Sequence, residues 1–212
     1  TFQVLLMVFR SKQRRLLCLA LGLLSFSLTL TISPAISAAF DASPIAISAR
    51  RNSEGTTIQA NANQNWLEQG RQLYRSGRFS EAVPAWETAA QRYRLSSDRL
   101  NEALSLSYLS LAQQELSQWQ DAQRSIEQSI AILKAAKPAA DAILWAQVLN
   151  TQASLQLHTG KSEEALESWK QAQKFYEQAG DSTGSWGSQI NQAQALQSLG
   201  YYRRARQELE AL

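Results

Sequence analysis

Cysteine and histidine, which often serve as nucleophiles, general bases or metal ligands, are scarce in this chain of 212 residues. It contains one cysteine, Cys18, and one histidine, His158. This pair of counts excludes disulfides, zinc fingers and most nucleophile–base pairs. The sequence also lacks a phosphate-binding glycine loop and a dinucleotide glycine fingerprint. We therefore expect no catalytic residue, no metal site and no cofactor among the residues present.

The one histidine precedes Thr159 and Gly160, at the expected end of a helix, where a positive charge is favoured. We interpret His158 as a capping or groove-lining residue. The alternative is a hydrolase that uses His158 with nearby carboxylates. Glu163 and Glu164 follow closely, but adjacent residues of a helix point in different directions. They fit the start of a helix better than paired acid–base chemistry.

The net charge of +3 comes from the N-terminal segment. Four basic residues precede residue 40 without any acid to balance them, namely Arg10, Lys12, Arg14 and Arg15. The rest of the chain is close to neutral, so the basic pI does not argue for a nucleic-acid partner. A second basic cluster, Arg203, Arg204 and Arg206, is interpreted as a solvated face.

Residues 1–39 have the order of a secretory signal peptide. The basic stretch is followed by an uncharged apolar run over residues 16–30, then by Pro34 and small residues up to Ala39, where we expect cleavage. An uncleaved membrane anchor is the alternative, because the apolar run approaches the length of a span. Met7 lies just before the basic stretch, so the residues ahead of it are interpreted as a reading-frame artefact.

Residues 40–62 are polar and lack a helical apolar period, which predicts a flexible linker. Once the leader is removed, the chain has no cysteine, a composition that suits an oxidising compartment. We therefore expect an extracytoplasmic location, secreted or periplasmic.

From residue 63 onward the sequence repeats with a period near forty residues. A turn residue recurs with spacings of 40, 43 and 40, at Gly77, Ser117, Gly160 and Gly200. Five positions after each stands an alanine: Ala82, Ala122, Ala165 and Ala205. Seven positions before each stands a small residue: Gly70, Ser110, Ala153 and Ala193. Nine positions after each stands a large apolar residue: Trp86, Ile126, Trp169 and Leu209.

This register predicts pairs of antiparallel helices. A small residue facing an alanine lets two backbones approach closely, and large side chains above and below lock the pair. Neither helix can bury its apolar face alone, so the pairs must stack. The predicted fold is all-α: a right-handed superhelical solenoid over residues 63–212. Its repeats are expected at 63–102, 103–145, 146–185 and 186–212, the last of them incomplete.

Local signals agree with this arrangement. Ser80 with Glu81, and Ser162 with the acids that follow it, predict caps and acidic first turns for the second helices. Gly180 and Gly184 predict a break between repeats.

Taken together, these positions resemble the tetratricopeptide repeat (TPR), whose pattern is Trp, small, Tyr or Leu, Gly, aromatic, Ala, large apolar, Ala. The first repeat matches at Trp66, Gly70, Leu73, Gly77, Phe79, Ala82, Trp86 and Ala89. The third matches at Leu149, Ala153, Gly160, Ala165, Trp169 and Ala172. The second repeat departs at Ser117 and Ser129, and the fourth at Gln189. A forty-residue period exceeds the usual ~34, so the resemblance is to the long-helix type, and it implies a protein-binding scaffold.

A narrower resemblance concerns residues 107–122, 149–181 and 187–205. These phrases are similar to the amino-terminal repeats of secreted bacterial proteins that carry a carboxy-terminal CHAT domain, a caspase-like peptidase with a His and Cys pair. No catalytic residue can be carried over, because the chain after residue 39 has no cysteine. The resemblance implies an N-terminal fragment of a longer protein. A free-standing secreted TPR adaptor without a catalytic domain is the alternative.

In the TPR family the concave groove is lined by the first helix of each pair. That rule predicts a peptide-binding groove at Gln64, Arg71, Tyr74, Arg75, Gln114, Gln147, Asn150, His158, Gln194 and Gln197. Amide side chains offer donors and acceptors together and can bond the backbone of an extended peptide. The expected partner is a protein, a peptide or the chain's own C-terminal domain. No nucleic acid is expected, and a membrane only if the leader is uncleaved.

Overall fold

The computed structural model describes residues 66–136 and 141–211. Residues 66–75 are helical and precede seven further helices: α4 (Phe79–Leu95), α5 (Arg99–Glu115), α6 (Trp119–Ala135), α7 (Ala142–His158), α8 (Ser162–Gln178), α9 (Ser182–Ser198) and α10 (Tyr202–Glu210). Within the described residues there is no strand, which confirms the all-α prediction. The predicted signal peptide and linker, and Gln64 of the predicted groove, lie outside the described residues.

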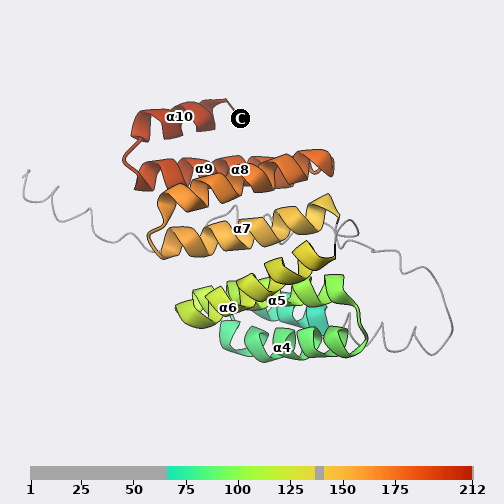
Figure 1. Ribbon diagram of the computed structural model, residues 1–212. Helices are drawn as coiled ribbons and strands as arrows, with labels where there is room; N and C mark the ends of the chain where they lie inside the picture. Colours follow the sequence, from blue (N-terminus) through green and yellow to red (C-terminus); the bar gives the residue numbers. More distant parts are fainter. Residues whose placement is uncertain (1–65, 137–140, 212) are drawn as a thin grey trace, which may run out of the picture. The chain divides into compact units, whose positions relative to one another are not determined.

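The helices form a stack of antiparallel pairs of TPR-like type (Figure 1). Each of α4 to α9 has 17 residues. Most neighbours are joined by three residues, which explains the period of forty. The connection over residues 136–141 is twice as long and accounts for the spacing of 43. Pairs begin at residues 99, 142 and 182, four residues before the repeat boundaries chosen from the sequence.

Every three-residue turn is closed in the same way. At the first one, Arg78 N–H donates to Leu73 O at 2.9 Å and Gly77 N–H donates to Tyr74 O at 2.9 Å. This is the Schellman arrangement, and it places the middle residue of the turn in the left-handed region. Glycine fills that place in four turns, whereas Ser97 (φ 60°) and Ser117 (φ 57°) adopt it without the freedom of glycine.

Helix starts differ between the two helices of a pair. The first helices α5, α7 and α9 follow an aspartate that accepts a hydrogen bond from the third helical residue, namely Asp98, Asp141 and Asp181. The second helices α4 and α8 follow Arg78 and Lys161, which make no side-chain cap bond. The caps predicted at Ser80 and Ser162 were therefore wrong, because both residues already lie inside helices. Their acidic first turns are confirmed.

Close packing within each pair follows the predicted register. Four alanines are fully buried, Ala82, Ala122, Ala165 and Ala205. The large residues nine positions after the turn are also buried in the first three pairs, at Trp86, Ile126 and Trp169, but Leu209 of α10 is 40% exposed. Gly184 was predicted to mark a break and instead lies inside α9, where a Cβ atom would stand 2.3 Å from the Tyr176 ring.

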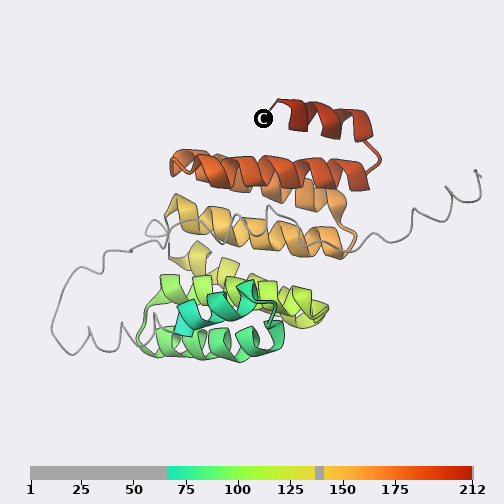
Figure 2. The same ribbon diagram turned by 180° about the vertical axis from the view of Figure 1, so that it is seen from behind.

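Pairs stack through their first helices. The second helix of one pair packs on the first helix of the next, α4 on α5, α6 on α7 and α8 on α9. In addition α5 packs on α7, and α7 touches α9 more lightly, while among the described residues no second helix packs on another to the extent that α5 packs on α7. Figure 2 shows the stack from the side opposite to Figure 1. No helix in residues 66–136 or 141–211 has the length and apolar content needed to cross a bilayer.

Candidate functional site: the inner row of first helices

The helix of residues 66–75 and helices α5, α7 and α9 form what we call the inner row. Elements that contact their equivalents directly lie on the shorter side of a curved stack, because the helices on the longer side are drawn apart. The packing of α5 on α7 is in keeping with first helices on that shorter side. Nine of the predicted groove residues belong to the helices of the inner row.

Those nine residues divide by exposure. Arg71, Tyr74, Gln114, Gln147 and Asn150 are buried. Arg75, His158 and Gln197 are exposed and Gln194 is half-buried. The exposed members are spread along the row, on three different first helices. The sequence rule thus selected both side chains that a partner can reach and side chains that hold neighbouring helices together.

Asn150 belongs to the second group. Its Oδ1 accepts a hydrogen bond from Trp169 Nε1 at 2.9 Å and another from Asn191 Nδ2 at 3.2 Å. The three residues come from α7, α8 and α9. A buried acceptor that serves two donors stabilises the junction of these helices. Asn150 is thus held by its own fold before any ligand arrives.

Tyr74 joins the first two pairs. Its hydroxyl donates to Glu115 Oε1 at 2.8 Å, across from the helix of residues 66–75 to the end of α5. Burial first, and the Glu115 carboxylate second, raise the pKa of Tyr74 above its ordinary value. One turn earlier, Arg71 lies 3.5 Å from Glu68. This end of the inner row therefore holds one ion pair and one hydrogen bond from a tyrosine to a carboxylate.

Between the second and third pairs, α5 and α7 meet through polar side chains. Ser107 Oγ donates to Thr151 Oγ1 at 3.1 Å, and Gln114 Nε2 donates to the Thr151 carbonyl at 3.3 Å. Thr151 Oγ1 in turn donates to the Gln147 carbonyl at 3.2 Å. We call these four residues the α5/α7 seam. Gln114 Oε1 and Gln147 Oε1 are buried there and have no hydrogen-bond partner.

His158 ends α7 and stacks on a neighbour. Its ring lies 5.9 Å from that of Trp119, with 19° between the planes. Its Nδ1 is 2.8 Å from the Ser154 carbonyl. Since a carbonyl only accepts, Nδ1 is the donor of this hydrogen bond. The contact of His158 with Trp119 was not predicted from the sequence.

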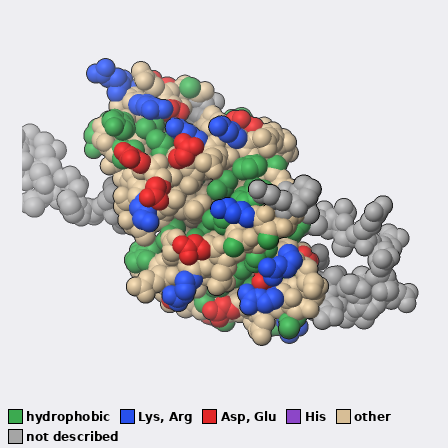
Figure 3. All heavy atoms as spheres, in the orientation of Figure 1, with side chains coloured by type: hydrophobic (Ala, Val, Ile, Leu, Met, Phe, Trp, Pro, Cys, Tyr) green, Lys and Arg blue, Asp and Glu red, His purple; other side chains and the backbone are tan. Residues whose placement is uncertain are grey.

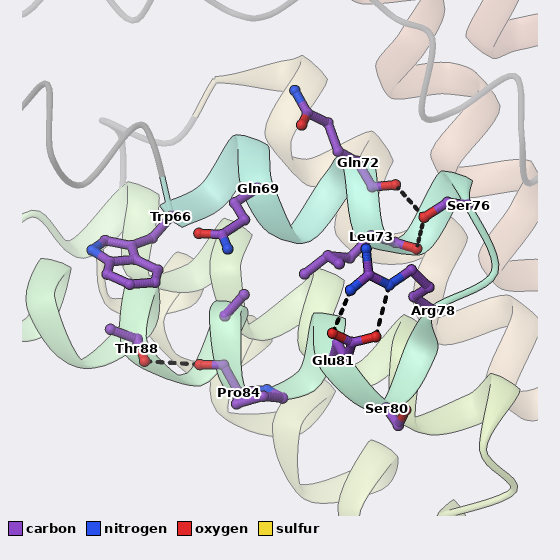
Figure 4. A pocket seen from close by; sticks show the side chains of 11 residues that line it. Trp66, Gln69, Gln72, Leu73, Ser76, Arg78, Ser80, Glu81, Pro84 and Thr88 are labelled. Carbon is purple, nitrogen blue, oxygen red and sulfur yellow. Dashed lines mark hydrogen bonds and ion pairs between the residues drawn. The ribbon is translucent and has the colours of Figure 1, made fainter.

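A second candidate is a cavity of about 590 Å³ between residues 66–75 and α4 (Figure 4). It is lined by Trp66, Gln69, Gln72, Leu73, Ser76, Arg78, Ser80, Glu81, Pro84, Ala85 and Thr88. Arg78 donates two hydrogen bonds to Glu81, at 2.7 and 2.5 Å, and these lower the pKa of the Glu81 carboxyl.

Sequence reasoning did not single out this cavity. In the second and third pairs, the positions equivalent to Leu73 and Ala85 hold a glutamine and a serine that bond each other, Gln113 with Ser125 and Gln156 with Ser168, each at 2.8 Å. Leu73 and Ala85 cannot make that bond. A comparison of the repeats at these two positions would have pointed to the first pair as different.

Chemistry at either place is limited. Within residues 66–136 and 141–211, no three His, Cys, Asp or Glu side chains gather where they could hold a metal ion. The carboxylate of the cavity is paired with Arg78, and the imidazole of the inner row is stacked and bonded to a carbonyl. Both arrangements suit binding of a partner by shape and hydrogen bonds.

Comparison with solved structures concerns the fold. The chain is similar to the crystal structure of BtubC (BKLC) from P. vanneervenii, with a TM-score of 0.60 and 13% sequence identity. The match covers 76% of this chain and 64% of that one, so this chain spans less than two thirds of the length of BtubC. At this identity the likeness extends to the fold alone.

A second solved structure, a Podosopora anserina protein with nearly identical TPR-like repeats, matches with a TM-score of 0.46 and 19% identity, over 69% of this chain and 91% of that chain. No protein-family model matches the sequence, and no curated protein does. The TPR-like helical repeat predicted from the sequence is nevertheless the fold observed.

Proposed function

We propose that this chain is an exported, non-catalytic scaffold that binds protein through its inner row, within a longer protein that carries a CHAT peptidase domain. TPR-like repeats generally bind proteins or peptides, and this fold is usually non-catalytic. The finer parts of the proposal are the export, the CHAT domain, the right-handed superhelix and the location of the groove. Each rests on the sequence patterns described above.

The observation that carries the binding function is the inner row itself. Its exposed members Arg75, His158 and Gln197 stand on three of the four first helices, those of residues 66–75, α7 and α9. Arg75 can donate hydrogen bonds, and His158 and Gln197 can both donate and accept them. A row of this kind, repeated from pair to pair, fits an extended partner better than a small molecule.

The opposite face supports the same choice. On the face shown in Figure 3, charges of both signs are interspersed with apolar side chains. Along the second helices α6 and α10, ion pairs form within one helix, such as Arg124 with Asp121 and Arg204 with Glu208. A mixed surface of short-range pairs is typical of a solvated outer side. The inner row is the better candidate for recognition.

The binding proposal is tested by selection of displayed 12-residue peptides on the purified full chain, followed by affinity measurements with one selected peptide. A triple variant, Arg75→Ala, His158→Ala and Gln197→Ala, changes only exposed side chains of the inner row. We expect it to weaken binding at least tenfold. The matched control changes exposed residues of second helices: Gln91→Ala, Gln128→Ala and Gln171→Ala. Equal loss in both variants would contradict a concave site.

Export and the CHAT domain need separate tests. Expression from Met7 in a bacterial host, with the mature N-terminus determined by mass spectrometry, tests cleavage near Ala39. A product that starts at Met7 in the cytoplasm would contradict export. Sequencing downstream of the codon for Leu212 tests the CHAT domain: a reading frame that encodes no such domain would contradict that part and leave the adaptor alternative.

A further inference from the structure

We infer that the α5/α7 seam is a cryptic site for the backbone N–H groups of an extended polypeptide, which Gln114 and Gln147 bind through their side-chain oxygens. The inference rests on the proposed function, because it names where in the inner row a partner is recognised and by which of its groups.

The first observation is a pair of buried acceptors without donors. Gln114 and Gln147 are 5% and 7% exposed, and neither Oε1 atom accepts a hydrogen bond. A buried amide oxygen without a donor has lost its water and gained nothing in return. Such atoms are uncommon in folded proteins. Gln114 of α5 and Gln147 of α7 each carry such an oxygen, so the contact between these two helices has fewer donors than acceptors.

The second observation is that both oxygens belong to the same seam. The amide of Gln114 reaches α7, since its Nε2 donates to the Thr151 carbonyl. Gln147 precedes Thr151 by one helical turn, so the two lie on one face of α7. Thr151 also meets Ser107 of α5, which shows that this face is the one turned to α5. A single segment entering the seam can therefore meet both glutamines.

The hydrogen bonds across the seam are long. Those that join its two sides, Ser107 to Thr151 and Gln114 to Thr151, measure 3.1 and 3.3 Å, longer than average for their kinds. The buried apolar cluster at this junction includes residues of α5, α6 and α7, such as Leu111, Leu133 and Val148. Separating α5 from α7 breaks the two long bonds, opens part of that cluster and brings water or donors to both oxygens.

The chemistry of the seam selects the backbone of the partner. Its lining is neutral, made of Ser, Thr and Gln, so a lysine or arginine side chain would enter without a countercharge. A terminal carboxylate would meet two acceptors and be repelled. An extended segment presents the N–H groups of alternate residues on one side, about 7 Å apart, and can supply two donors at once.

The test uses the full chain and a synthetic copy of a peptide selected by display. Gln147→Leu removes one unsatisfied oxygen. We expect it to weaken binding at least tenfold while its thermal unfolding midpoint stays the same or rises. Gln114→Leu should weaken binding similarly, although it also loses the bond to Thr151. Gln128→Leu, an exposed glutamine of α6, is the matched control and should bind as the parent does. If Gln147→Leu loses helical circular dichroism, Gln147→Met keeps the length of the side chain and takes its place.

Peptides methylated at single backbone nitrogens identify the donor. Methylation at the critical position should weaken binding to the parent at least tenfold and have little further effect on Gln147→Leu. Parental affinity in both seam variants would overturn the inference while the proposed function stands. Coupling to a lysine or arginine of the peptide, in place of the backbone nitrogen, would also overturn it. Failure to select any peptide would contradict the proposed function itself.

Discussion

The first and third helix pairs bury a tryptophan at the same position of the repeat, but its indole N–H donates to a different kind of acceptor in each. In the first pair, Trp86 Nε1 donates to the Leu67 carbonyl at 3.1 Å. In the third pair, Trp169 Nε1 donates to Asn150 Oδ1 at 2.9 Å, and Asn150 occupies the position equivalent to Leu67. The donor is the same, but the acceptor is backbone in one case and side chain in the other.

This difference sets which small residue fits beneath the ring. An indole that bonds a carbonyl is drawn onto the helix backbone, and a Cβ atom added at Gly70 would stand 2.3 Å from Trp86 Nε1. An indole that bonds a longer side chain leaves room for the fully buried Ala153. The small position of the repeat pattern therefore requires glycine in the first pair and accepts alanine in the third. The hydrogen-bond acceptor of the tryptophan determines which of the two residues fits.

The strongest way to break the comparison is Gly70→Ala. The added methyl group must displace the Trp86 ring from its acceptor, so we expect a loss of about 3 kcal/mol, the upper part of the range for overpacked cores. Urea unfolding followed by circular dichroism measures it. The reciprocal change, Ala153→Gly, adds no atoms and should lose only about 1 kcal/mol through helix propensity. Equal losses of stability at the two sites would show that the Trp86 and Trp169 rings lie equally close to the backbone of the first helix.

Asn150→Ala tests the acceptor of the third pair. It leaves the Trp169 and Asn191 donors buried without their shared partner, and we expect a loss of about 2 kcal/mol. Unfolding of this variant should be compared with that of Asn101→Ala, an asparagine at the start of α5. A stability equal to that of the parent would mean that water replaces the lost oxygen.

Two buried tyrosines give a smaller contrast. The Tyr74 hydroxyl bonds Glu115, whereas the Tyr176 hydroxyl is buried without a partner. Burial raises the pKa of Tyr176, so its hydroxyl stays protonated at neutral pH. Tyr74→Phe should lose about 1 kcal/mol and Tyr176→Phe should be neutral or stabilising. Thermal unfolding of both variants at pH 7 checks this order, and the reverse order would contradict it.

The turns give the smallest effect. Gly77 and Gly160 occupy the left-handed position in the first and third pairs, while Ser117 occupies it in the second. Ser117→Gly should stabilise the protein by about 0.5 kcal/mol, because relief of the left-handed strain exceeds the added freedom of the unfolded chain. Differential scanning calorimetry can detect the shift. The same change at the helical Ser125 should destabilise, which separates the turn from a general effect of glycine.

Much of the fold follows from periodicity alone. The spacing of Ala82, Ala122, Ala165 and Ala205 predicted the pairs and their stacking, because only a close helix contact requires a methyl-sized side chain at each of these positions. The starts of the helices were harder to place. Ser80 and Ser162 have the residue type of a cap. Each of these turns, however, has three residues, and the hydrogen bonds that close it fix where the next helix begins.

The site was predicted less well, since a rule about which helix lines a groove does not say what its side chains already bond. Gln114, Gln147 and Asn150 have the same kind of side chain and were selected for the same reason. Only the structure shows that Asn150 serves two internal donors while the two glutamines retain unused oxygens. The cavity beside Trp66 was missed because it depends on a bond that the first pair lacks.

The uniform helix length has a consequence for the size of the epitope. Seventeen residues at about 1.5 Å each give α5, α7 and α9 a length of about 25 Å. An extended polypeptide aligned with one of these helices can therefore contact it over only about seven residues. A polypeptide crossing the row encounters a new helix every 10 Å or so, roughly every third residue. A polypeptide aligned with one helix can be recognised only over the length of that helix. A polypeptide that crosses the row gains contacts with each further helix pair.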